Sequence, residues 1–186
     1  MQHWTARVGI IIALVCTTLL TPAPMLGKTD EASLDLAARY ILETVKGFRT
    51  AYVLTVVEQL KESGVQPKED WLNGAHAIPL PAQFVKAAGG YMKSFEIGLI
   101  GLTPVSKGNL PKTKLESDAL MRLANDRTQP VIIFVDGNQL KGVSADLAIV
   151  QSCVDCHNSH PNSTWKSFKK WDIMGAVIVR INKSTE

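Results

Sequence analysis

The chain contains the sequence C-V-D-C-H, in which Cys153, Cys156 and His157 carry the chemistry. The C-x-x-C-H spacing is the attachment site of a c-type haem. Two thiols separated by two residues can add to the two vinyl groups of one porphyrin, and the imidazole that follows can coordinate iron from the proximal side. The motif therefore predicts one covalent haem c with His157 as proximal ligand. A protein of this kind carries electrons or reports the state of its iron.

Two other interpretations of the motif remain open. The first is a thiol–disulfide oxidoreductase that uses Cys153 and Cys156, because the pair follows the apolar run 147–150. Such a motif should open a helix, whereas residues 158–161 have the composition of a loop. The second is a structural zinc site made by the two cysteines with His157 and His160. Zinc sites usually draw their ligand pairs from separated segments, and here all four would lie within eight residues.

The N-terminal residues 1–27 are predicted to be a secretory signal peptide, which leaves a single domain over residues 28–186. Arg7 supplies the positive charge, residues 8–20 form an apolar run of 13 residues, and residues 21–27 contain proline and small residues. The run is short for a membrane span, which needs about 20 residues. We therefore expect a bacterial periplasmic or otherwise exported protein, with membrane attachment only through an uncleaved signal.

The composition fits one globular domain: 46% of the residues are hydrophobic and 20% are charged. A net charge of +3 and the absence of a basic stripe with interleaved aromatic residues argue against binding to nucleic acid. The third cysteine, Cys16, lies in the N-terminal apolar run. No structural disulfide is therefore expected, despite the exported context.

The pattern of apolar residues predicts an α+β fold with one central antiparallel sheet, a long N-terminal helix and flanking short helices. The C-x-x-C-H motif is predicted to lie in a polar loop before the last strand. The long helix should bury one continuous apolar stripe that includes Phe48 and Tyr52. The expected helices span 30–63, 81–91 and 115–125, and the expected strands span 95–105, 130–135, 139–145 and 172–181.

Three segments resemble a family of exported, PAS-like domains that carry one c-type haem and were long catalogued as a domain of unknown function. They are C-V-D-C-H-N-S-H-P at 153–161, I-P-L-P-A-Q-F at 78–84 and R-T-A-Y at 49–52, with Asp172 and Gly175 downstream. The resemblance covers roughly residues 36–181. Two features depart from its pattern: Met174 stands where a basic residue is expected, and Trp165 and Phe168 alter the aromatic residues after the motif.

The resemblance implies a PAS-like fold and a role in redox sensing, gas sensing or electron transfer. Many relatives attach such a domain to histidine-kinase or chemoreceptor modules. This chain carries neither, so we expect its signal or electron to pass to a separate protein partner. No catalytic activity is indicated. Lys166, Lys169 and Lys170 are expected to form a solvated face, or to dock an acidic redox partner.

Further cofactor contacts are predicted at Arg49, Tyr52 and His160. Arg49 and Tyr52 match the family segment on the long helix, where Arg49 could pair with a haem propionate and Tyr52 could line the pocket. The alternatives are a solvated arginine and a core tyrosine. His160 is expected to be a hydrogen-bonding neighbour of the haem site, or else a loop histidine.

The distal ligand cannot be chosen from the sequence. The predicted mature chain has no third cysteine, so a thiolate is excluded. An open sixth position would favour binding of a small gas, and inert six-coordinate iron would favour electron transfer. The candidate ligands are His76, Met92, Met121 and Met174, or none.

Overall fold

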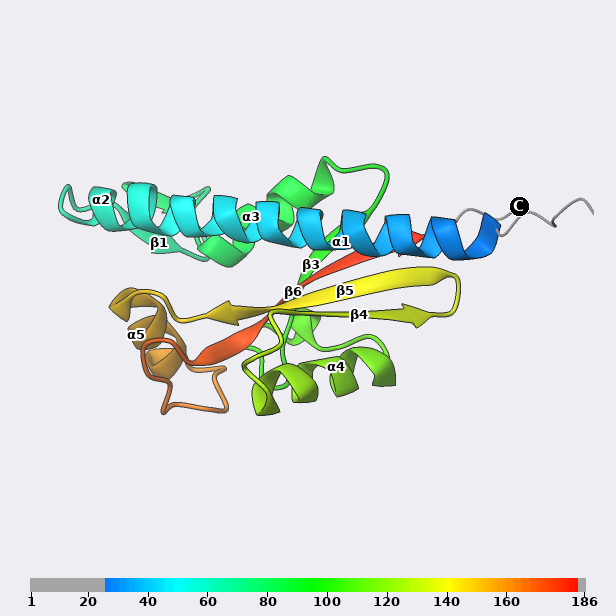
Figure 1. The fold of residues 1–186 in the computed structure, drawn as a ribbon. Helices are drawn as coiled ribbons and strands as arrows, with labels where there is room; N and C mark the ends of the chain where they lie inside the picture. The colour runs from blue at the N-terminus through cyan, green and yellow to red at the C-terminus, as the bar shows by residue number, and fades with distance from the viewer. Residues whose placement is uncertain (1–25, 184–186) are drawn as a thin grey trace, which may run out of the picture.

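The computed structural model describes residues 26–183, which form a four-stranded antiparallel sheet with helices on both faces (Figure 1). The predicted α+β class is confirmed. The predicted signal peptide lies almost entirely outside the described residues. The elements are α1 Leu26–Ala51, η1 Tyr52–Val57, α2 Glu58–Lys61, β1 Gln66–Lys68, β2 Ala77–Pro79, α3 Pro81–Gly90, β3 Glu96–Ile100, η2 Lys107–Asn109, α4 Lys114–Asn125, β4 Val131–Asp136, β5 Gln139–Leu147, α5 Gln151–Ser159 and β6 Ile173–Asn182.

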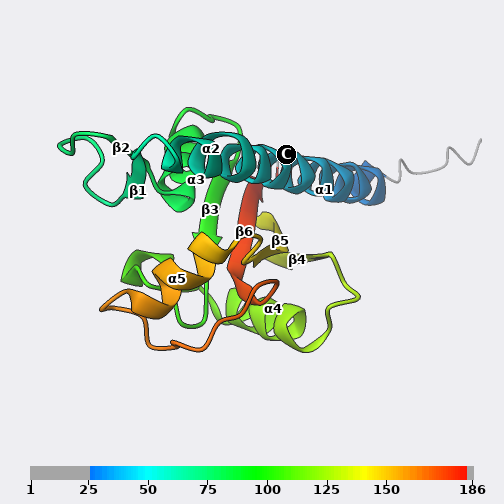
Figure 2. The same cartoon turned by 90° about the vertical axis from the view of Figure 1, so that its left-hand side faces the viewer.

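The sheet has the order β3-β6-β5-β4, so the last strand lies between two earlier ones. Alternate side chains of β6 point to opposite faces, as expected for a strand. Val177 and Val179 pack with Ala38 and Leu42 of α1, while Ile178 belongs to a second core against α4. The sheet is therefore buried on both faces, with α1 and α3 on one side and α4 on the other (Figures 1 and 2).

The long helix is not α-helical throughout, because residues Tyr52–Val57 form a π-helix. An α-helix has 3.6 residues per turn, so residues four apart are rotated slightly past one another around the helix axis. A π-helix has wider turns, which brings residues four apart back toward the same face. Arg49, Val53 and Val57 are consequently all buried on one face. The predicted stripe is wrong at Phe48, which is 66% exposed. Phe48 lies in α1 before the π-helix, where the buried face of the helix carries the neighbouring residue Arg49 instead.

A cluster of buried charges joins α4 to the sheet. Glu116 of α4 is fully buried and accepts hydrogen bonds from Lys141 of β5 at 2.8 Å and from Arg180 of β6 at 2.8 and 3.0 Å. Asp136 accepts a further bond from Lys141 at 2.8 Å. Burial would raise the pKa of Glu116, but the bonds from Arg180 and Lys141 outweigh it and lower that pKa to about 2.

The C-x-x-C-H motif lies on helix α5, so the prediction of a polar loop is wrong. This short helix connects β5 to β6, at the end of the molecule where α2 and β1 also lie (Figures 1 and 2). The Ser152 hydroxyl donates to Oε1 of Glu58 at 2.7 Å, which ties α5 to α2. Within residues 26–183, no helix has the length and apolar character that crossing a membrane requires.

Candidate haem site

The three motif side chains converge on one cavity. Cys153 and Cys156 are three residues apart on α5, so they lie on the same face of the helix. His157 is four residues after Cys153 and shares that face. All three line a cavity of about 320 Å³, together with Val53 and Val57 of the π-helix.

A second cavity of about 400 Å³ adjoins the first, and Cys156, His157 and Arg49 line both. Its wall is largely apolar, with Leu99 and Ile100 of β3 facing the motif. The segment 78–84 that carries part of the family resemblance supplies wall residues to both cavities. Sites for small molecules and cofactors commonly occupy 300–1,000 Å³ and are mostly apolar with a few polar groups.

Burial raises the pKa of both motif thiols, Cys153 and Cys156. Reactive oxidoreductase thiols show the opposite shift, because the thiolate is the nucleophile. The motif lies on a helix, which removes the earlier argument against a thiol–disulfide oxidoreductase. The raised pKa values of the two thiols are a new argument against that activity. Burial lowers the pKa of His157, with the charges of Arg49 and His160 adding to the effect. A neutral imidazole is the form that ligates a metal.

Asn158 is a site residue that the sequence did not single out for a role. Its side-chain amide donates to the carbonyl of Phe168 at 3.0 Å, and its oxygen accepts from the Phe168 N–H at 2.9 Å. These two bonds hold the following loop against α5. The Phe168 ring then meets the His157 ring edge-on, with centroids 5.5 Å apart. Asn158 thus helps to orient the imidazole. Its position directly after His157 in the sequence is the feature that could have marked it as a site residue.

Arg49 faces this site and is buried, so it is not a solvated helix residue. Its Nη2 lies 2.9 Å from Oδ2 of Asp146, which also lines the larger cavity. Lys46 is a second cation near that carboxylate, and it donates to the Ser144 hydroxyl at 2.9 Å. Burial raises the pKa of Asp146, and both cations oppose that shift.

Two polar atoms at the larger cavity are buried without partners. Among residues 26–183, Arg49 Nε and Asn109 Oδ1 are buried side-chain atoms that make no hydrogen bond. Both residues line the cavity. Buried polar groups are normally satisfied, so unpaired ones suggest a missing partner. The unpaired N–H of Arg49, at a cavity that Cys156 and His157 also line, fits a cofactor with an apolar body and an anionic edge group, whereas the Asn109 oxygen requires a donor.

Tyr52 does not lie among the described residues that line either cavity. Its hydroxyl donates to the Pro79 carbonyl at 2.7 Å, and its ring stacks on Phe84 with centroids 4.4 Å apart. Tyr52 therefore supports the wall segment from behind. Direct contact of this side chain with a cofactor stays a prediction.

His160 lines the larger cavity, close to the motif. Its Nε2 lies 3.4 Å from Oε1 of Glu69, and its Nδ1 accepts from the Asn162 N–H at 3.1 Å. Both ring nitrogens are thus engaged within the protein. This arrangement agrees with an outer hydrogen-bonding residue better than with an iron ligand.

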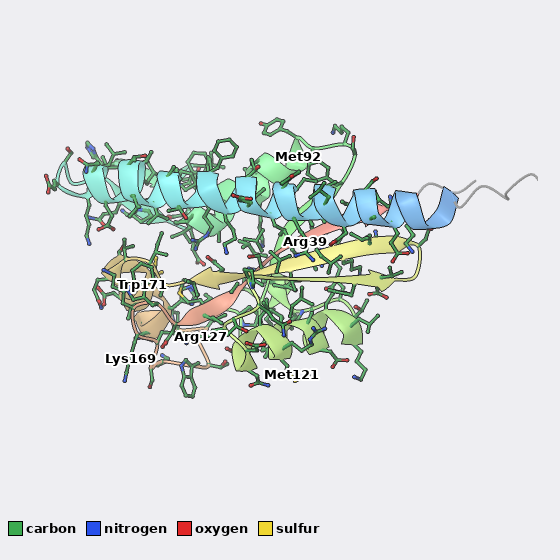
Figure 3. All side chains as sticks on the ribbon, in the orientation of Figure 1. Arg39, Met92, Met121, Arg127, Lys169 and Trp171 are labelled. Atoms are coloured by element: carbon green, nitrogen blue, oxygen red, sulfur yellow. The ribbon has the colours of Figure 1, made fainter. Side chains whose placement is uncertain are left out.

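The four candidate distal ligands all lie within the described residues, and Met174 alone lines the cavities. Met92 and Met121 are 38% and 44% exposed and lie away from α5, as Figure 3 shows. His76 is exposed in the loop between β1 and β2, in a left-handed backbone conformation (φ 53°). The structure thereby separates candidates that the sequence left equivalent.

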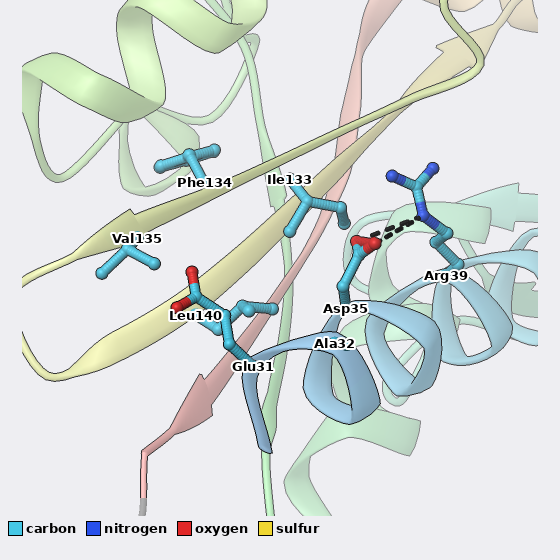
Figure 4. A pocket seen from close by; sticks show the side chains of 8 residues that line it. All are labelled: Glu31, Ala32, Asp35, Arg39, Ile133, Phe134, Val135 and Leu140. Atoms are coloured by element: carbon cyan, nitrogen blue, oxygen red, sulfur yellow. Dashed lines mark hydrogen bonds and ion pairs between the residues drawn. The ribbon is translucent and has the colours of Figure 1, made fainter. Parts of the chain in front are cut away.

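The zinc alternative gains no support. Within residues 26–183, no group of three or more His, Cys, Asp or Glu side chains is arranged to hold a metal ion. Another hollow, of about 430 Å³, lies between the first turns of α1 and the β4–β5 hairpin (Figure 4). Its charged residues are Glu31 and the exposed pair Asp35–Arg39, which are 3.1 Å apart. It contains no thiol or imidazole and lies far along α1 from α5 (Figure 1).

Comparison with known families decides the classification. The model of the Tll0287-like family matches residues 28–182. The chain belongs to the Tll0287-like family. This confirms the resemblance found at 153–161, 78–84 and 49–52. Among solved structures, this Tll0287-like chain is similar to the crystal structure of the cyanobacterial haem protein Tll0287. The two are 17% identical, the match covers 74% of this chain and 96% of that chain, and the TM-score is 0.49. No curated protein matched the chain.

Proposed function

We propose that this protein is an exported c-type cytochrome with one covalent haem, which passes electrons to or from a separate protein. The observation that carries the proposal is the convergence of Cys153, Cys156 and His157 on one cavity. The order of the antiparallel sheet and the long α1 helix support a PAS-like fold for the domain.

The residues of the site divide the work of holding the group. Cys153 and Cys156 would each hold the group through one thioether, in which the S–H of the thiol is added across a vinyl double bond and no atom is lost. His157 would offer its imidazole to iron, and the edge-on contact with Phe168 would limit the rotation of that ring. Arg49, whose Nε–H is unpaired, would donate to a propionate at the polar edge of the group. The bound haem supplies a one-electron couple at iron.

Gas or redox sensing is the second candidate function. The larger cavity extends beyond the motif toward β3 and α3, which leaves room for a small ligand. The two functions differ at the sixth coordination position: a firmly held protein ligand favours electron transfer, whereas a vacant position favours sensing. Neither function requires an enzymatic reaction.

The partner is expected to present acidic groups. Lys166, Lys169 and Lys170 are exposed on the loop that follows α5, and Trp165 and Trp171 are exposed beside them (Figure 3 labels Lys169 and Trp171). A basic surface close to the cofactor site would steer an acidic redox protein toward it. A periplasmic location follows from the predicted signal peptide and stays part of this proposal.

Expression in a host that can attach haem tests the proposal. The purified protein should keep its colour after denaturation and acid–acetone extraction, and its mass should rise by one haem. A Cys153→Ser/Cys156→Ser variant is the matched control, and its colour should be extractable. A colourless parent protein with two titratable thiols would contradict the proposal and favour thiol–disulfide chemistry.

A further inference from the structure

Met174 is the extra residue of a β-bulge at the start of β6. Asp146 pairs with Gly175, and the next residue of β5, Leu147, pairs with Ile173. Met174 therefore has no partner across the ladder. A bulge bends its strand and redirects a side chain, and bulges are over-represented next to active sites.

The redirected side chain lies at the cavities. Met174 lines both of them, as His157 does. The backbone next to Met174 has little room to shift, because β6 approaches β3 very closely at Gly175. A Cβ added at Gly175 would stand 2.6 Å from the carbonyl oxygen of Ile100, a contact that no real side chain could make. This close approach constrains the backbone that presents the Met174 side chain to the cavities.

We propose that Met174 supplies a second protein ligand to the haem iron, in addition to His157. This inference rests on the proposed covalent haem. Thioether sulfur is a haem ligand, and a methionine–histidine pair raises the reduction potential of iron. The competing groups are less suited: His160 is engaged at both ring nitrogens, and the lysines at the cavity rim (Lys61, Lys68 and Lys86) are exposed to solvent.

This ligand would make the protein an electron carrier with closed coordination. Oxidation or reduction at iron would then act on the β5–β6 bulge. The bulge adjoins Asp146, the ion-pair partner of Arg49 on the long helix. The sixth ligand and the helix would thus be connected through one strand.

Methionine-to-leucine substitutions of the holoprotein test the ligand, because the two residues have similar volumes and exchange with little damage to packing. In the parent, ferric protein should show the near-infrared charge-transfer band of methionine-ligated iron. Met174→Leu should lose that band, lower the potential and bind carbon monoxide faster when reduced. Met92→Leu and Met121→Leu are the controls and should match the parent in all three measurements.

An unchanged band and potential in Met174→Leu, or a parent that lacks the band, would overturn the assignment. Should Met174→Leu not fold, Met174→His provides the second test, because an imidazole at the same position should convert the spectrum to that of bis-histidine iron. Retention of the parent spectrum in Met174→His would also overturn it. Failure of the covalent-haem proposal is distinct, since the parent itself would then be colourless after extraction.

Discussion

Arg49 shows how much one residue can depend on its environment. It is 7% exposed and pairs with Asp146, although it lies on a helix whose other arginine, Arg39, is exposed. Its second role follows from the unpaired Nε at the cavity. Arginine can hold two carboxylates at once because its guanidinium offers five N–H groups. We infer that it joins Asp146 on one side and a haem propionate on the other.

Replacement of Arg49 by leucine should lower both stability and reduction potential. Asp146 would lose its ion-pair partner, and removing one member of a buried pair costs about 3–5 kcal/mol. The lost positive charge would favour oxidised haem, so the potential should fall. Arg49→Lys should recover part of both losses, because lysine keeps the charge but not the paired hydrogen bonds.

Urea unfolding and redox titration measure these two effects. Arg39→Leu is the matched control, since its pair with Asp35 is exposed and should contribute less than about 1 kcal/mol. If the potential of Arg49→Leu equals that of the parent while stability falls, the contact with the propionate is excluded and the ion pair with Asp146 remains.

At the scale of elements, α5 and the loop after it form a unit. The helix places the thiols and the imidazole, and the loop returns Phe168 to the His157 ring. Asn158 closes this unit with two hydrogen bonds to the backbone of Phe168. The loop should therefore become mobile if that one side chain is removed.

Asn158→Ala should destabilise the protein by about 1–3 kcal/mol, the sum of two net hydrogen-bond contributions. Hydrogen exchange at residues 163–168 should become faster, and the absorbance band of the proposed haem should broaden. Asn162→Ala on the same exposed loop is the control, because hydrogen bonding at that position uses the backbone N–H. Equal exchange rates in both variants would show that Asn158 does not hold the loop.

At the scale of the whole molecule, the Glu116 cluster fastens α4 to the sheet on the face opposite α1. Its folded pKa of about 2 lies below the value of about 4.3 that a glutamate has in an unfolded chain. The cluster therefore stabilises the fold at pH values above the pKa that Glu116 has in the unfolded chain. This stability is lost as the pH falls from about 4.3 toward 2.

Glu116→Gln should lower the free energy of unfolding by about 3 kcal/mol at pH 7, because Lys141 and Arg180 would lose a buried counter-charge. Its unfolding free energy should also fall less steeply than that of the parent below pH 4.3 or so. Asp118→Asn on the same helix is the control, since its pair with Lys114 is exposed. Parallel pH profiles for the parent and Glu116→Gln would refute the assignment.

Local patterns in the sequence determined much of this protein. The C-x-x-C-H spacing identified the site, and the family segments at 49–52 and 78–84 pointed to residues that line or support it. The alternating and helical apolar patterns predicted the order of helices and strands, because such patterns reflect interactions within a few residues. The patterns did not predict the π-helix or helix α5, because the conformation of these segments depends on what packs against them.

Only the tertiary structure decided which distant residues meet. The position of β6 between β3 and β5 places Arg180 beside Glu116 and creates the bulge at Met174. The same packing brings Asp146 to Arg49 and separates Met174 from the exposed methionines. These contacts depend on the register of the strands and on packing between residues that are far apart in the sequence. Local sequence spacing determines neither.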